Sequence, residues 1–298
     1  MNEQTTGAVV AGVDGSPGAL HAVRWAAREA GRRNRPLRLV HATDELSINY
    51  PRGLPTSDDL RGVLRMRGQR LLRTARDAAR EVEPGIEPEL LLSHEGAATT
   101  LLDQSRSAAL LVLATQGMRP LGRFFSGSVS IALTAHASCP VALIRGHVAE
   151  DAPPSEGPVV VGVDGSVASE EAVAVAFDEA SWRGAPLIAV HSWDDAFLTA
   201  VFEETHWTLD HDQIQEREGE VLAERLAGWQ EKCPDVAVER VVTHGRPAVA
   251  LLDQADSAQL IVVGSRGRGG FAGMLLGSTS QAVMSYALCP VLVARHQG

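Results

Sequence analysis

The feature that most constrains the fold of this 298-residue sequence is an internal repeat with an offset of 150 residues. The stretch VVAGVDGS at Val9–Ser16 returns as VVVGVDGS at Val159–Ser166. The same offset relates further points across both halves: Pro36-Leu37 and Pro186-Leu187, His94 and His244, Leu101–Gln104 and Leu251–Gln254, and Cys139–Val141 and Cys289–Val291. A register kept over so many points indicates that one domain was duplicated. Two copies are too few for a solenoid, and each is long enough to bury its own core.

The boundaries of the two copies follow from composition. Residues 150–158 (EDAPPSEGP) are too rich in proline for a helix or a central strand, so we interpret them as a linker. We therefore predict a first domain over residues 1–149 and a second over residues 159–298.

Each half alternates short apolar runs with helical stretches. The strands expected in the first half are Val9–Val13, Leu37–Ala42, Ile86–Ser93, Leu110–Leu113 and Val141–Ile144. The first helix is expected to begin at Pro17 and to close at Gly31, and the later helices are expected over Asp58–Val82, Ala97–Ser107 and Ser128–Ala137. The second half repeats this order, with a long helix over Gln213–Lys232 that places Val221 in the core. The alternation predicts an α/β fold of two tandem doubly wound domains, each a five-stranded parallel sheet with helices on both faces.

A glycine-rich loop marks the expected ligand crevice of the second half. It follows the run Leu260–Val263 as Gly264-Ser265-Arg266-Gly267, and after nine intervening residues comes Gly277-Ser278 at a helix start. Glycines let the backbone approach phosphate oxygens, and the free N–H groups of a helix N-terminus point at them. The loop lacks the Gly-Lys-Ser/Thr of a P-loop, and the match of Gly267-x-Gly269-x-x-Ala272 to a dinucleotide fingerprint is weak because it does not open the first βα unit. A surface loop without a ligand is the other interpretation.

Polar side chains near the loop fit a nucleotide. Asp14 and Asp164 directly follow the first strand of each half, where a carboxylate accepts hydrogen bonds from ribose hydroxyls or an adenine amino group. An aspartate before glycine is also a common turn residue. Arg266 and Arg268 are expected either to screen phosphate charge or to lie on a solvated loop.

Together these motifs resemble a known family. The sequence Val-Gly-Val-Asp-Gly-Ser, the spacing Gly-x2-Gly-x9-Gly-Ser and the repeated Cys-Pro-Val are similar to tandem universal stress proteins of the actinobacterial kind, in the ATP-binding subclass. The resemblance covers nearly the whole chain and implies ATP, with or without Mg²⁺, as the ligand. In the first half it places the ligand on Gly12, Val13, Asp14, Ala42, Gly117, Gly127, Ser128 and Ser130. In the second half it places it on Gly162, Val163, Asp164, Ser192, Gly264, Gly267, Arg268, Gly277, Ser278, Thr279 and Ser280.

The first half departs from the signature at Ala114, where the family has its first glycine. If this position needs a positive φ or a very close ligand, alanine costs about 1 kcal/mol or more. We therefore expect the second site to be the stronger one, and the first to bind weakly or not at all.

The expected function is binding rather than catalysis. The sequence has no Gly-x-Ser-x-Gly, His-Glu-x-x-His or Cys-x-x-Cys motif, and its single lysine, Lys232, lies on a long helix away from the loop. His41 and His191 end second strands and are expected in the core or the crevice wall, and we predict neither a catalytic residue nor a metal site. The resemblance implies an ATP-dependent sensor or regulator in stress response, dormancy or growth control. A slow ATPase or nucleotidyl-transferring enzyme, and a nucleotide-free scaffold, are the alternatives.

Charge and composition limit which kinds of partner and which location we expect for this protein. The net charge of −10 argues against nucleic acid as a partner. No apolar run approaches the ~18 residues of a membrane span, no signal-peptide pattern opens the sequence, and three cysteines are too few for a disulfide framework, so a cytoplasmic protein is expected. The charge is uneven: residues 1–150 carry 18 Arg or Lys against 15 Asp or Glu, and residues 151–298 carry 9 against 22. This difference either helps the halves to dock or reflects surface drift after duplication.

The fifth strands are candidates for assembly. Val141–Ile144 and Val291–Ala294 are apolar and expected at sheet edges, where unpaired strands invite pairing. In the family this strand makes the dimer contact, so we expect a homodimer or an intramolecular pseudo-dimer. The sequence does not identify a regulatory protein partner.

Overall fold

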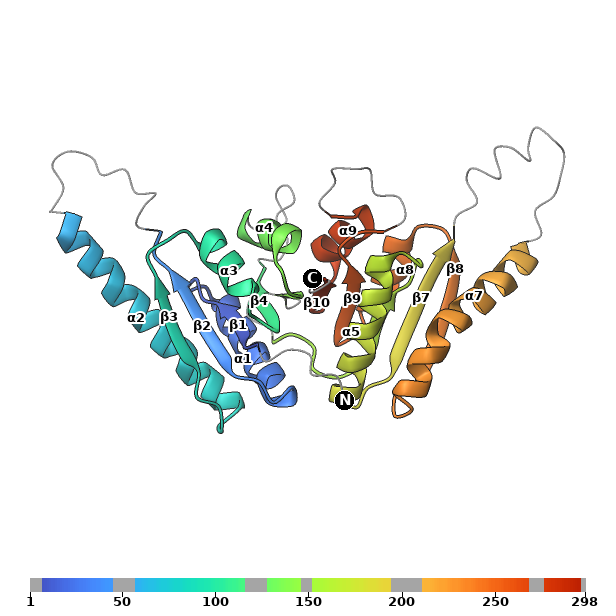
Figure 1. The fold of residues 1–298 in the computed structure, drawn as a ribbon, viewed down its shortest axis with the longest axis horizontal. Coiled ribbons are helices and arrows are strands. Elements are labelled where there is room, and N and C mark those ends of the chain that lie inside the picture. Colours follow the sequence, from blue (N-terminus) through green and yellow to red (C-terminus); the bar gives the residue numbers. More distant parts are fainter. Residues whose placement is uncertain are drawn as a thin grey trace, which may run out of the picture. The chain divides into compact units, whose positions relative to one another are not determined.

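The computed structural model describes residues 7–44, 57–115, 128–145, 152–193, 211–267 and 276–295. The chain divides after Pro153 into two compact units, called unit 1 and unit 2 below, and each is described by itself (Figure 1). Both units are α/β domains built from a parallel sheet and helices.

Unit 1 is a doubly wound domain. Its strands lie in the order β3-β2-β1-β4-β5, and neighbouring strands are parallel. The helices pack as two pairs, α1 with α2 and α3 with α4 (Figure 1). The elements are β1 (Val9–Gly12), α1 (Pro17–Arg32), β2 (Leu37–Ala42), α2 (Ser57–Val82), β3 (Glu89–Ser93), α3 (Ala97–Ser105), β4 (Leu110–Ala114), α4 (Ser128–His136) and β5 (Val141–Ile144).

Unit 2 repeats this architecture. Its strands lie in the order β8-β7-β6-β9-β10 with parallel neighbours, and its helices pair as α5 with α7 and α8 with α9. The elements are β6 (Val159–Gly162), α5 (Val167–Arg183), β7 (Leu187–Trp193), α7 (His211–Lys232), β8 (Val238–His244), α8 (Pro247–Ala255), β9 (Leu260–Gly264), α9 (Ser278–Tyr286) and β10 (Val291–Ala294). The predicted fold class, two tandem domains with five parallel strands each, is confirmed.

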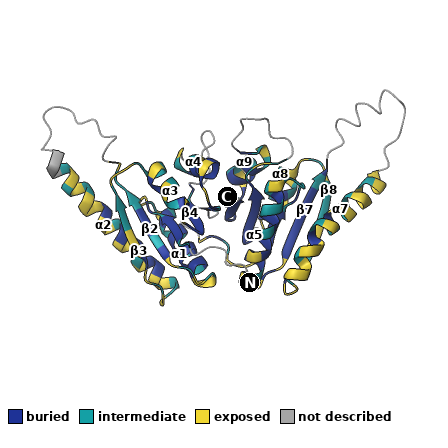
Figure 2. Ribbon diagram, in the orientation of Figure 1, coloured by how far each residue is buried: buried dark blue, intermediate teal, exposed yellow. Residues whose placement is uncertain are grey.

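The central strands form the cores because their continuous apolar runs are covered on both faces. Leu110 of β4 and Leu260 of β9 have no exposed surface, and Figure 2 shows the same burial along most of the central strands. The first helix of each unit starts at a serine N-cap. The Oγ atoms of Ser16 and Ser166 accept hydrogen bonds from backbone N–H groups one turn later, as the sequence predicted for Ser16.

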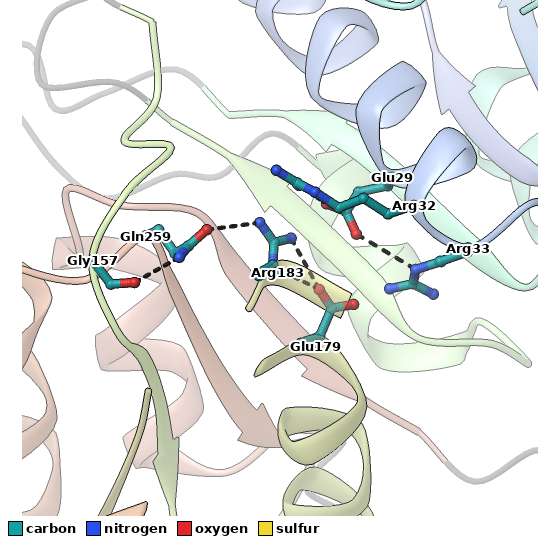
Figure 3. Close-up of polar contacts among 7 residues, drawn as sticks. All are labelled: Glu29, Arg32, Arg33, Gly157, Glu179, Arg183 and Gln259. Atoms are coloured by element: carbon teal, nitrogen blue, oxygen red, sulfur yellow. Dashed lines mark hydrogen bonds and ion pairs between the residues drawn. The ribbon is translucent and has the colours of Figure 1, made fainter. Parts of the chain in front are cut away.

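A buried ion pair lies at the end of α5, and hydrogen bonds connect it to the segments just before β6 and β9 (Figure 3). The Oε2 atom of Glu179 lies 2.9 Å from a guanidinium nitrogen of Arg183, and their side chains are 0% and 2% exposed. Arg183 donates to the Gln259 side chain at 3.2 Å, and Gln259 donates to the Gly157 carbonyl at 2.6 Å. A buried carboxylate needs such a partner, because an unpaired charge in the core is strongly destabilising. The repeat mate of Glu179 is equally buried and pairs within unit 1 as Glu29 with Arg32 and Arg33.

Some element ends differ from the sequence prediction. Gly31 does not close α1, which continues through Arg32; Asn34, with φ of 49°, takes the left-handed position beyond the helix. Its repeat mate Gly184, with φ of 60°, is the left-handed C-cap of α5. The third strand starts at Glu89 and not at Ile86, because the turn and the preceding proline cannot join the ladder.

Two further predictions concern helices. Val221 of α7 is 37% exposed, so its placement in the core was wrong, whereas Leu222 and Leu226 are buried there. Among the helices in the described part of the chain, none combines the length and apolar character that a membrane crossing requires.

Candidate functional site

Each unit has a cavity at the carboxyl ends of its first and fourth strands. β1 pairs with β4, and β6 pairs with β9, so these ends lie side by side, as predicted. The strand order reverses between them, which is where doubly wound sheets hold ligands. The cavity volumes are about 460 Å³ in unit 1 and about 430 Å³ in unit 2.

The structure brings most of the predicted site residues of unit 2 into one cavity wall. Arg268 lies outside the described residues, but its neighbour Arg266 lines the cavity. The other predicted residues all line it: Gly162, Val163, Asp164, Ser192, Gly264, Gly267, Gly277, Ser278, Thr279 and Ser280.

Unit 1 repeats the wall where it is described. Gly117 and Gly127 lie outside the described residues. The remaining predicted residues line the cavity: Gly12, Val13, Asp14, Ala42, Ser128 and Ser130.

The aspartates after the first strands are turn residues and cavity residues at once. The Oδ1 atom of Asp164 accepts a hydrogen bond from the Ser166 N–H at 2.9 Å, and that of Asp14 accepts one from the Ser16 N–H at 2.8 Å. These bonds close the turn that starts α5 or α1, aided by a glycine in the left-handed region, Gly165 in unit 2. Both interpretations of the aspartates from sequence are therefore compatible, since one oxygen shapes the turn and the carboxylate still borders the cavity.

A histidine on the second strand of each unit contacts the backbone just before the same turn. The Nδ1 atom of His191 lies 2.7 Å from the Val163 carbonyl oxygen, and that of His41 lies 2.6 Å from the Val13 carbonyl oxygen. In unit 2 the other ring nitrogen contacts the Glu218 carboxylate of α7 at 2.8 Å. Each histidine therefore orients the backbone that borders the cavity. His41 also lines the cavity of unit 1.

The amino end of α9 opens onto the cavity of unit 2. Gly277 is its N-cap and provides no capping side chain, whereas α5 is capped by Ser166. A helix start without a side-chain cap leaves backbone N–H groups for an anion, and the helix dipole adds positive potential. The N-terminus of α9 and the positively charged residue Arg266 in the wall therefore make this side of the cavity suited to phosphate oxygens.

Two hydrogen bonds join the start of α9 to the end of β9 and the residue that follows it. The hydroxyl of Ser280 donates to the Gly264 carbonyl at 2.6 Å, and the Gly277 N–H donates to the Ser265 carbonyl at 3.0 Å. The proton of the Ser280 hydroxyl is thus used within the protein. Ser278 and Thr279 remain as cavity-lining hydroxyl groups at the start of α9.

The first glycine of the signature is required by helix packing. Gly264 does not have a positive φ. A Cβ atom at this position would lie 2.6 Å from the Ala168 carbonyl oxygen in the first turn of α5. In unit 1 the methyl group of Ala114 lies 3.5 Å from where a Cβ of Gly18 would be, which is an ordinary contact. The alanine in unit 1 is therefore accommodated by the local spacing of helix and strand and does not close the cavity.

Sequence reasoning missed several wall residues. Ser169 of α5 lines the cavity of unit 2, and its hydroxyl accepts a hydrogen bond from the Asp164 N–H at 3.0 Å. The first two turns of α3 and α8 provide an apolar wall, which includes Leu101 and Leu251. The repeat of Leu101–Gln104 in the sequence was the available signal for this wall. Arg145 donates to the Thr115 hydroxyl at 3.3 Å, directly after β4. Burial lowers the pKa of the Arg145 guanidinium.

Comparison with protein families shows which family the chain belongs to. The family described as "Universal stress protein family" matches residues 6–145 and again 157–295. The chain belongs to the universal stress protein family. Its two matched segments correspond to the two units of the structure.

Relatives match almost the whole chain. Universal stress protein Rv2623 of Mycobacterium tuberculosis is 44% identical over 298 residues, which cover 96% of each chain. Universal stress protein Rv2005c of the same organism is 43% identical over 294 residues, again with 96% of each chain covered. Among solved structures, a universal stress protein from Archaeoglobus fulgidus shares the fold with a TM-score of 0.70 at 18% identity, covering 98% of this chain and 97% of its own.

Proposed function

We propose that this universal stress protein binds ATP, most tightly in unit 2, and that the bound nucleotide controls a regulatory interaction. The observation that carries the proposal is the cavity of unit 2, where the uncapped start of α9, Arg266 and the Asp164 turn meet at the strand switch point. Its volume of about 430 Å³ lies within the ~300–1,000 Å³ typical of small-molecule sites.

The proposed roles follow from the wall. Backbone N–H groups of α9, with the Ser278 and Thr279 hydroxyls and Arg266, would hold the phosphates. Asp164 would accept hydrogen bonds from the ribose, and the backbone around Ser192 would meet the adenine. The family resemblance further suggests that phosphate and ribose are contacted by Arg268 in unit 2 and by Gly117 and Gly127 in unit 1.

The two cavities are similar in size, but the wall of unit 2 has more hydroxyl side chains at equivalent positions. Where unit 2 has Ser169, Ser192 and Thr279, the repeat-equivalent wall residues of unit 1 are Ala19, Ala42 and Val129. Each exchange removes a hydroxyl group; the Ser192 hydroxyl donates to the Gly245 carbonyl, so Ser169 and Thr279 carry the difference toward a ligand. Gln116 stands in the sequence where unit 2 has Arg266. We therefore propose that unit 2 binds phosphate more tightly. The reason is its hydroxyl groups and Arg266, and not the presence of Ala114 in unit 1.

Binding without rapid turnover fits the described wall. No lysine lines either cavity within the described ranges, and no cluster of three metal-ligating side chains occurs there. Rapid phosphoryl transfer normally uses such groups. Mg²⁺, if bound, would be held chiefly by the phosphates of ATP and by water. A slow ATPase remains the alternative function, and a turnover above about 1 s⁻¹ would favour it.

Other universal stress proteins have been solved with nucleotides. One from Archaeoglobus fulgidus was solved in complex with dAMP, and another universal stress protein with cAMP. Those ligands belong to those proteins, and the case for this chain rests on its own cavities. The wider proposal is a cytoplasmic regulator in stress response, dormancy or growth control, which associates through its fifth strands and acts on a protein partner.

Calorimetric titration with ATP and with adenosine tests the proposal. The variant Arg266→Gln/Thr279→Val gives unit 2 the residues of unit 1, so ATP affinity should fall by about tenfold or more, or about 1.4 kcal/mol. Adenosine affinity should barely change, because adenosine has no phosphates. Equal losses for both ligands, or no ATP binding to the wild type at millimolar concentration, would contradict the proposal.

A further inference from the structure

The outer face of α2 is basic and partly apolar, although it belongs to an acidic protein. Val63 and Met66 are 53% and 59% exposed, and they lie on the same side of the helix as the exposed arginines at 67, 70 and 73. This side is opposite to Leu72, Ala75 and Ala79, which are buried against the sheet. We call the five residues the basic stripe; they are Val63, Met66, Arg67, Arg70 and Arg73.

The arginines of the basic stripe are not neutralised by any residue that the structure describes. The described ion pairs of α2 use other residues, namely Arg76 with Asp77, Arg80 with Glu87, and Glu81 with Arg24 of α1. Arg67, Arg70 and Arg73 make no ion pair or hydrogen bond with any part of the chain that the structure describes. Exposed Met and Arg on one face are typical of protein interfaces.

The repeat-equivalent face of unit 2 has the opposite character. A shallow hollow lies between α7 and β8, lined from α7 by Glu216, Gly219, Glu220 and Ala223 and from β8 by Arg240, Val241 and Val242. Glu224 lies exposed one turn further along α7. Where unit 1 has Met66, Arg70 and Arg73, unit 2 therefore has Glu216, Glu220 and Ala223. We call Glu216, Glu220 and Glu224 the acidic stripe.

We propose that the basic stripe of one copy of this chain docks on the acidic stripe and hollow of a second copy. Met66 and Val63 would cover Val241 and Ala223 in the hollow, and the three arginines would meet the three glutamates. Gly219 and Ala223 leave the hollow open where unit 1 has the larger Gln69 and Arg73. Arg217 and Arg240 are the opposing positive charges on this face, and the glutamates outnumber them.

A second copy fits better than an anionic membrane. A membrane explains the arginines, but it does not explain why the same face of the repeated domain became acidic and hollowed in unit 2. The contact joins two different surfaces, so it leaves one of each exposed and allows further copies to add. Figure 2 shows exposed residues along the outer faces of both helices.

The test measures mass by sedimentation velocity over a range of protein concentrations, at about 50 mM and about 500 mM NaCl, because screening shortens the reach of exposed charges from about 14 Å to about 4 Å. The wild type should associate with rising concentration at low salt and lose this added mass at high salt. A wild-type mass that does not depend on salt would overturn the proposal, as would binding to phosphatidylserine vesicles without salt-dependent association.

Reciprocal charge reversal separates the contact from folding. The variant Arg67→Glu/Arg70→Glu/Arg73→Glu should lose low-salt association, and so should Glu216→Arg/Glu220→Arg/Glu224→Arg. A mixture of the two variants should associate again, since each now matches the other. These sites are exposed, so circular dichroism should show both variants folded. Undiminished association of either variant alone, or no recovery on mixing, would overturn the proposal.

Discussion

Replacing Gly264 by alanine tests the role of the first signature glycine. The new Cβ would lie 2.6 Å from the carbonyl oxygen of Ala168, 2.8 Å from its carbonyl carbon and 3.1 Å from its Cβ. The two nearest are backbone atoms of a helix whose start is fixed by the Ser166 cap, so relief requires a shift of α5 against β9. Overpacking of this kind typically costs about 1–3 kcal/mol, and we expect unit 2 to lose that much stability.

The matched control is Ala114→Gly in unit 1. It removes a methyl group that has ordinary contacts, so it should cost no more than about 1 kcal/mol, mainly in backbone entropy. Urea unfolding followed by circular dichroism gives both values, with the transition of each unit fitted separately. The Gly264→Ala variant should also bind ATP more weakly, because Gly264 accepts the Ser280 hydrogen bond. If it keeps wild-type stability and affinity, the packing explanation is wrong.

The remaining predictions concern the loop, a helix cap and a thiol. A Cβ at Gly267 would lie 2.6 Å from the Asp164 carboxylate, so Gly267→Ala should turn that side chain and weaken ATP binding with little loss of stability; an unchanged titration would contradict this. Ser166→Ala removes the N-cap of α5 and should cost about 1 kcal/mol in urea unfolding, whereas a change near zero would mean that the cap is unimportant. Burial raises the pKa of the Cys289 thiol to about 12, so the reactive thiolate is scarce below that pH. Iodoacetamide at pH 8 should therefore modify Cys289 only in urea, and mass spectrometry showing equal rates in the native protein would refute it.

Much of the fold was accessible from sequence because the signals were local or repeated. The apolar runs at Val9 and Leu110 predicted buried strands, and Ser16-Pro17 predicted a helix start. The 150-residue offset then transferred each assignment to the other half. The strand pairing that places Asp14 and Asp164 at the crevice followed from the topology of doubly wound sheets.

Features that depend on the approach of distant segments were not accessible. Gly31 looked like a helix end, but the left-handed residue is Asn34, three positions later. The need for glycine at position 264 arises from the Ala168 carbonyl, nearly a hundred residues away in sequence. Sequence alone suggested a backbone or ligand requirement there, and it could not reveal the packing requirement against Ala168.

Nucleotide content of the purified protein tests the central claim most directly. The protein would be purified without added nucleotide and denatured, and the released small molecules quantified per chain by anion-exchange chromatography, for the wild type and for Arg266→Gln/Thr279→Val. We predict about one ATP or more per wild-type chain, with clearly less from the variant. Wild-type protein that releases no nucleotide and takes up none from millimolar ATP would contradict the account.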